Sequence, residues 1–155
     1  MSTTYAFEVE GLEFEIFFTT KEVPQNNSTI DTVLRFFNAE YCVVADHSLF
    51  SQPSTQKDLE LMDNLKYALE NGNVTLQLND DQTSLVFKAN FGTISGKPVI
   101  YCTYVKKFTK DLGKVILQKK YDDLLAKYND LVTKHKELMD KYSDANSALT
   151  MSKIN

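Results

Sequence analysis

Acidic side chains near the N-terminus have a spacing that could support chemistry. Glu8, Glu10, Glu13 and Glu15 alternate with apolar residues, and paired carboxylates can act as a general acid and base or can hold a cation. Alternation with period two also places such side chains on one face of a strand pair, where a row of glutamates is typical of a solvated surface. We therefore predict neither a catalytic nor a metal-binding role for these glutamates.

The other residues with reactive side chains are too scattered to predict a site. His47 has no second histidine in the first 105 residues. Asp80 and Asp81 lack the glycine and the further ligand positions of a calcium loop. Cys42 and Cys102 form neither a disulfide framework nor a metal quartet, and because both lie in apolar runs we predict buried free thiols.

Short motifs for catalysis or nucleotide binding are absent from the sequence. GxGxxG, GxxxxGK[ST], HExxH, GxSxG and paired CxxC do not occur. The glycine-containing segment 92–96 does not precede a helical pattern, so it is not expected to cradle a phosphate. We predict a protein that is not an enzyme, with no catalytic residues, no metal and no cofactor.

A β-hairpin is predicted to position the N-terminal glutamates. Apolar residues alternate over 5–9 and over 12–18, and the dipeptide at positions 10–11 can form a two-residue turn. In this register the alternating apolar side chains, from Tyr5 to Phe18, fall on one face and the glutamates on the other. The predicted pairs are Val9 with Leu12, Phe7 with Phe14 and Tyr5 with Ile16.

The rest of the first 107 residues predicts two helices and further strands. Ile30, Val33, Leu34 and Phe37 recur at helical spacing, which predicts a helix over 29–38. Further expected elements follow in chain order: a buried strand over 41–45, a polar loop from His47 to Pro53, a helix over 55–70 that stops at Asn71-Gly72, and three strands over 74–78, 85–91 and 99–105. Together they predict an α+β head, an antiparallel β meander packed with two helices.

The last third of the chain contains a seven-residue repeat. KYDDLLA, KYNDLVT, KHKELMD and KYSDANS follow one another from residue 120, without proline or glycine. The repeat gives two apolar columns whose spacing alternates between four and three residues, the pattern of a coiled coil with d and a positions. The d column is Leu117, Leu124, Leu131, Leu138 and Ala145, and the a column is Tyr121, Tyr128, His135, Tyr142 and Leu149. These ten residues are called the seam, and its helix would be roughly 50 Å long.

The columns beside the seam leave the number of chains open. Position g is lysine in four heptads, and position e is apolar at Leu125, Val132 and Met139. Ion pairs between g and e therefore cannot set the pairing, and the broad a/d/e face could suit three or four helices or docking on another surface. Alternatively, the lysine stems cover the e residues in a two-stranded coil. We expect a parallel homodimer, with trimers, tetramers and antiparallel pairing as alternatives.

The distribution of charge and the hydropathy of the chain argue against nucleic-acid and membrane partners. Residues 1–105 hold 14 acidic and 6 basic side chains, and residues 106–155 hold 7 acidic and 11 basic. An acidic head argues against nucleic-acid binding, and the basic residues of the tail are interleaved with acids as on a solvated helix face. Neither a signal-peptide pattern nor an apolar run of about 20 residues is present. We expect a globular head over 1–107, a stalk over 108–155, and a cytoplasmic or nuclear location with no membrane partner.

The predicted order of elements suggests a family. A starting hairpin, a helical insert that ends in Leu65–Gly72 (LKYALENG), three antiparallel strands and a direct exit into a coil resemble the superfamily of head-plus-coiled-coil proteins. This superfamily includes the DNA end-joining ligase partner and the centriolar cartwheel protein. The resemblance implies a parallel dimeric stalk, heads able to pair a second time, and a scaffolding role.

Three functions are therefore weighed from the sequence. The first is a non-enzymatic scaffold of the cytoskeletal or centriolar kind, which self-assembles through the stalk and presents the head to another protein or to a second head. The second is a viral structural or accessory protein clamped by a trimeric or tetrameric coil. The third is a nucleic-acid-associated repair scaffold that uses the basic tail, with Lys119, Lys120, Lys127 and Lys134 as the phosphate contacts.

Overall fold

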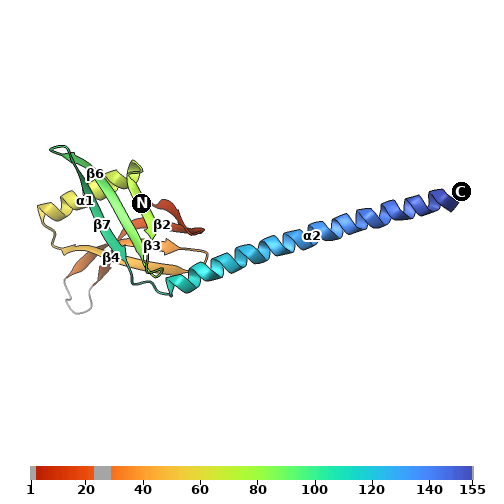
Figure 1. Cartoon of the computed structure of the whole chain (residues 1–155). Coiled ribbons are helices and arrows are strands. Elements are labelled where there is room, and N and C mark those ends of the chain that lie inside the picture. The colour runs from red at the N-terminus through yellow and green to blue at the C-terminus, as the bar shows by residue number, and fades with distance from the viewer. Residues whose placement is uncertain (1–2, 23–28, 155) are drawn as a thin grey trace. The chain divides into compact units, whose positions relative to one another are not determined.

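The computed structural model describes residues 3–22 and 29–154 (Figure 1). Contacts divide the chain into two units, Met1–Ile116 and Leu117–Asn155. The elements, in chain order, are β1 (Tyr5–Val9), β2 (Leu12–Glu22), β3 (Ile30–Asn38), β4 (Val43–Gln52), α1 (Gln56–Glu70), β5 (Val74–Leu78), β6 (Leu85–Ile94), β7 (Lys97–Val105) and α2 (Leu112–Ile154). Strands β1 to β4 form one antiparallel sheet in sequence order and β5 to β7 form a second. The predicted α+β class, with a head followed by a long C-terminal helix, is confirmed.

The N-terminal hairpin has the predicted register. Val9 pairs with Leu12, Phe7 with Phe14 and Tyr5 with Ile16. The turn residues Glu10 and Gly11 have φ angles of 52° and 81°, the left-handed conformation that a two-residue hairpin turn requires at both positions. The hairpin therefore presents one buried apolar face and one exposed acidic face, as predicted.

Helix α1 also begins and ends close to the predicted positions. The Thr55 side chain accepts a hydrogen bond from the backbone N–H of Asp58, and the Asp58 carboxylate accepts one from the N–H of Thr55. This reciprocal capping satisfies two of the backbone donors that a helix leaves free at its N-terminus. At the other end Gly72 has a φ of 72°, which directs the chain away from the helix and into β5.

The predicted helix over 29–38 is wrong, because this segment is strand β3. Leu34, Phe36 and Asn38 are buried at alternate positions, and β3 pairs with β2 on one side and β4 on the other. Its β-branched and aromatic residues favour a pleated strand between two neighbours over a helix. At the register shift between Thr32 and Val33 three consecutive residues, 32–34, are buried, and such an irregularity imitates helical spacing in the sequence.

Strand β4 and the exposure of the two cysteines correct further predictions. It begins at Val43 and continues to Gln52, so His47 lies in a strand and not in a polar loop. Cys42 lies in the preceding turn with a φ of 54°. Both Cys42 and Cys102 are exposed thiols rather than buried ones, the second because it lies on the outward face of β7.

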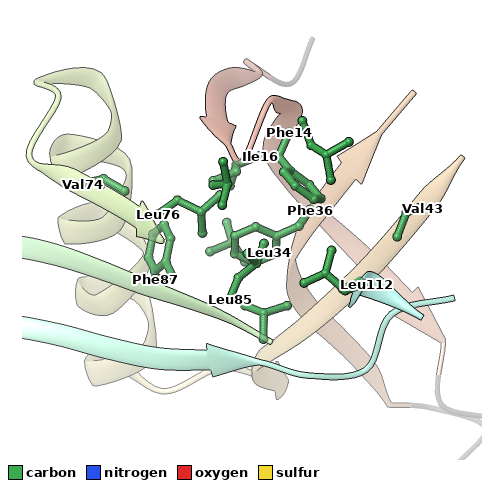
Figure 2. Close-up of a cluster of buried hydrophobic side chains, with 14 of the residues drawn as sticks. Phe14, Ile16, Leu34, Phe36, Val43, Val74, Leu76, Leu85, Phe87 and Leu112 are labelled. Atoms are coloured by element: carbon green, nitrogen blue, oxygen red, sulfur yellow. The ribbon is translucent and has the colours of Figure 1, made fainter. Parts of the chain in front are cut away.

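The hydrophobic core of the first unit lies between the two sheets. Phe36 of β3 meets Phe87 of β6 edge to face, with ring centroids 5.7 Å apart. Figure 2 shows these side chains among their neighbours from β2, β5 and α2. Helix α1 adds Leu65, Ala68 and Leu69, and the first turn of α2 adds Leu112, Val115 and Ile116.

A buried asparagine closes the turn between β3 and β4. Asn38 is 1% exposed; its side-chain N–H donates to the Glu13 carbonyl at 2.9 Å and its side-chain oxygen accepts from the Tyr41 N–H at 2.8 Å. Because both of its polar ends are paired, the amide is buried without an unsatisfied group. Asn38 thereby fixes the turn to the neighbouring strand β2.

Candidate self-association site

The seam residues form an exposed apolar row along helix α2. The d leucines 117, 124, 131 and 138 are 65–67% exposed and the a tyrosines 121, 128 and 142 are 60–68% exposed. Leu149, His135 and Ala145 are exposed as well. In the described part of the second unit α2 is the single element, so no other segment of that unit covers this row.

Exposure along α2 changes abruptly at the boundary between the two units. Val115 and Ile116 are 7% and 5% exposed, whereas Leu117 is 67% exposed. The first turn of the helix therefore belongs to the core of the head, and the heptad pattern begins with the next residue. This is why Leu117 is the first seam residue.

Charged side chains lie beside the seam and make ion pairs within the helix. Lys134 lies 3.0 Å from Asp130, and Lys119 lies 3.3 Å from Asp123. Such exposed pairs contribute only a few tenths of a kcal/mol each to a single helix. They orient the lysine and aspartate side chains along the helix but cannot provide the free energy of assembly.

The e column widens the apolar face on one side of the seam. Leu125 and Met139 are 42% and 52% exposed, and Val132 between them is partly exposed. A strip of three apolar residues at heptad spacing extends along the row of d leucines. Because of this strip, assemblies of three or four chains remain alternatives to a dimer.

The acidic hairpin face does not form a metal site in the described part of the chain. Glu8 and Glu13 are direct neighbours across β1 and β2, and both are exposed, as are Glu10 and Glu15. Among residues 3–22 and 29–154, no group of three or more His, Cys, Asp or Glu side chains could hold a metal ion. These glutamates form a solvated surface.

A polar cluster between β4 and β7 was not predicted from the sequence. His47 Nε2 lies 3.2 Å from the Tyr101 hydroxyl and 3.0 Å from the Thr103 hydroxyl, and Tyr101 stacks on Phe91. Burial lowers the pKa of His47 below its ordinary value and raises that of Tyr101. The only sequence signal was the alternating pattern through both strands, which places His47 and Tyr101 on faces that can meet.

A second polar contact joins β4 to β3. The Arg35 guanidinium donates two hydrogen bonds to the Asp46 carboxylate, at 2.7 Å and 3.0 Å, and the two residues are direct neighbours in the sheet. This bidentate geometry is the stronger form of such an ion pair. It occupies the only arginine of the chain in a structural contact.

Comparisons with known proteins give one weak likeness in fold. No family model and no curated protein matches the sequence. A solved structure of a mutant N-terminal fragment of Leishmania SAS-6, containing parts of its coiled-coil domain, is similar over 95% of this chain and 97% of that one, with 12% identity and a TM-score of 0.46. This likeness shows no family, and nothing in it supports the predicted likeness to the DNA end-joining ligase partner.

The seam exposes a row of large apolar side chains along the described part of the second unit. Burying one leucine side chain stabilises an assembly by about 1.5–3 kcal/mol, and the seam holds five leucines and three tyrosines. A single helix in water gains none of this free energy, and its own hydrogen bonds alone make it only marginally stable. The arrangement can bind another amphipathic helix.

The cluster around His47 predicts a pH dependence of head stability. Because folding lowers the His47 pKa below 6.5, the unfolded chain binds the proton more readily, and stability is lost as the pH falls from above 6.5 through the folded pKa. We expect the urea midpoint of the head transition to fall over this range. In His47→Gln this part of the pH dependence should disappear, and an equal fall in both proteins would assign it to other groups.

No helix within the described residues is long and apolar enough to span a membrane.

Proposed function

We propose that this protein is a non-enzymatic scaffold that assembles with copies of itself through the seam of α2. The observation that carries the proposal is the heptad row from Leu117 to Leu149, in which eight of the ten positions are leucines or tyrosines that are each more than half exposed. An isolated helix gains nothing from a d/a row of this length. The row has the spacing that knobs-into-holes packing against a second helix requires. The head contributes a folded module at the start of each stalk.

The proposed assembly is a parallel homodimer. Lysines at g carry long alkyl stems that can cover the e residues of the neighbouring helix while the ammonium groups stay in water, which leaves a two-stranded seam without exposed e side chains. The heads would then present a surface to another protein or pair with a second head. Such a scaffold would act in the cytoplasm or nucleus, within a cytoskeletal structure such as the centriole.

A second candidate is a clamp of three or four chains. The apolar e column supports it, because Leu125, Val132 and Met139 would be buried directly in a wider bundle rather than covered by lysine stems. A viral structural or accessory protein could use such a clamp. The two candidates differ in stoichiometry.

The solution mass of the whole chain tests the proposal. Light scattering over a wide concentration range should give twice the chain mass of 17.7 kDa at neutral pH. Three or four times that mass would favour the clamp, and the mass of one chain at all concentrations would overturn self-assembly. A further increase at high concentration that persists after the seam is disrupted would indicate head-to-head pairing.

A further inference from the structure

One position of the seam differs from the others in chemistry. His135 occupies the a column between Tyr128 and Tyr142, and the d residues on either side of it are Leu131 and Leu138. Its side chain is exposed on α2, with Lys134 beside it at the g position. The Lys134 ammonium lies 3.0 Å from Asp130, at the c position on the outer side of the helix.

We propose that His135 determines the parallel, in-register pairing of two stalks and makes that pairing dependent on pH. The inference rests on the proposed self-assembly through the seam. It adds what would select the pairing register and what would regulate the pairing. The partner is a second copy of this chain.

Parallel pairing in register places the two His135 side chains opposite each other. An a residue packs into a hole formed by four residues of the second helix, here its Leu131, Lys134, His135 and Leu138. Two neutral imidazoles in one layer can share a hydrogen bond, because each ring has one donor and one acceptor nitrogen. Both rings are then buried with a polar partner.

Other pairings replace the second imidazole by a side chain of different size and polarity. In a parallel pairing shifted by one heptad, each His135 would face a tyrosine ring, and in an antiparallel pairing it would lie among the d leucines. A buried polar group without a hydrogen bond costs free energy that a leucine at the same place would not. A single polar a position therefore selects the register in which it meets itself.

The charges around the layer explain why protonation should separate the stalks. Histidine changes its charge between pH 5 and 8. In a parallel pair the charged residue at the positions that flank this layer would be Lys134 of both copies, at g, while Lys136 lies at b on the outer side. The e residues next to the layer, Val132 and Met139, supply no carboxylate. Glu137 and Asp140 lie at c and f, on the outer side.

Two imidazolium ions would therefore face each other with lysines beside them and no acidic side chain in the layer. Repulsion in a desolvated seam is stronger than in water, so two charged imidazoles in one layer would oppose pairing. By linkage, acidification shifts the equilibrium toward single chains. The effect reverses when the pH is raised.

The dissociation constant of the whole chain at pH 8.0 and 5.5 tests the pH dependence. We expect pairing to weaken roughly tenfold or more at pH 5.5, and to change little with pH in His135→Asn, which keeps a polar layer that does not titrate. His135→Leu should pair more tightly at both values. Because His47 is present in all three proteins, its titration cannot produce a difference among them.

Cross-linking at a second layer tests the pairing register. In a chain with Cys42→Ser and Cys102→Ser, the substitution Ala145→Cys places one thiol at a d position, where oxidation joins two copies only if they are parallel and in register. We expect nearly complete cross-linking, and a loss of about half of it when His135→Leu is added, because alternative pairings then compete. His135→Asn should restore it.

The outcomes separate the two proposals. A chain that is monomeric at pH 8.0 would overturn self-assembly and this inference with it. An assembled chain with the same dissociation constant at both pH values, or with cross-linking unaffected by His135→Leu, would overturn the inference alone.

Discussion

Leu131→Asp is expected to convert the assembled chain into single chains without unfolding the head. Leu131 is 66% exposed on α2 and lies in the middle of the five d positions, so in a dimer two of its side chains share one layer. Removing both loses about 3–6 kcal/mol of buried surface, and two facing carboxylates add desolvation and repulsion. A loss of at least 3 kcal/mol weakens binding by more than about a hundredfold.

Light scattering should detect this loss as a fall to the mass of one chain at micromolar concentrations. Ala126→Asp is the matched control, because it places the same side chain at the exposed f position of the preceding heptad with a similar cost in helix propensity. It should remain assembled. If Leu131→Asp kept the mass of the unmodified chain, or if both variants dissociated equally, the seam would not be the assembly surface.

The sequence was most informative where one periodic pattern extends without interruption. The hairpin register followed from alternation on both sides of Glu10-Gly11, and the end of α1 followed from Asn71-Gly72. The long helix α2 followed from the heptads. In each case the local pattern and the tertiary environment favour the same structure, which is when prediction from sequence succeeds.

Features that depend on contacts distant in sequence could not be predicted in this way. His47 and Tyr101 are 54 positions apart, and only the packing of β4 near β7 brings their side chains together. The exposure of Cys102 depends on which face of β7 points outward, because residues on both faces of that strand are apolar or aromatic. The division into two sheets was likewise not visible in a chain of antiparallel strands.

The incorrect helix over 29–38 has a simple physical origin. Ile30, Val33, Leu34 and Phe37 satisfy helical spacing, but the same segment satisfies period two through Leu34, Phe36 and Asn38, and the segment is too short for periodicity to decide. Pairing with β2 and β4 decides it, since a strand between two neighbours satisfies all its backbone groups in the sheet. The two structures bury different phenylalanines.

Phe36→Ala is therefore expected to destabilise the head far more than Phe37→Ala. Phe36 is fully buried against Phe87, and truncating such a side chain costs about 3–5 kcal/mol, a large part of the stability of a small domain. Phe37 points to the opposite face of β3 and is partly exposed, so its truncation should cost about 1 kcal/mol or less. Urea unfolding followed by tyrosine fluorescence would measure both. If residues 29–38 formed a helix with Phe37 on its apolar stripe, Phe37→Ala would be the more destabilising substitution. The comparison of the two unfolding free energies therefore tests the strand at the centre of the head.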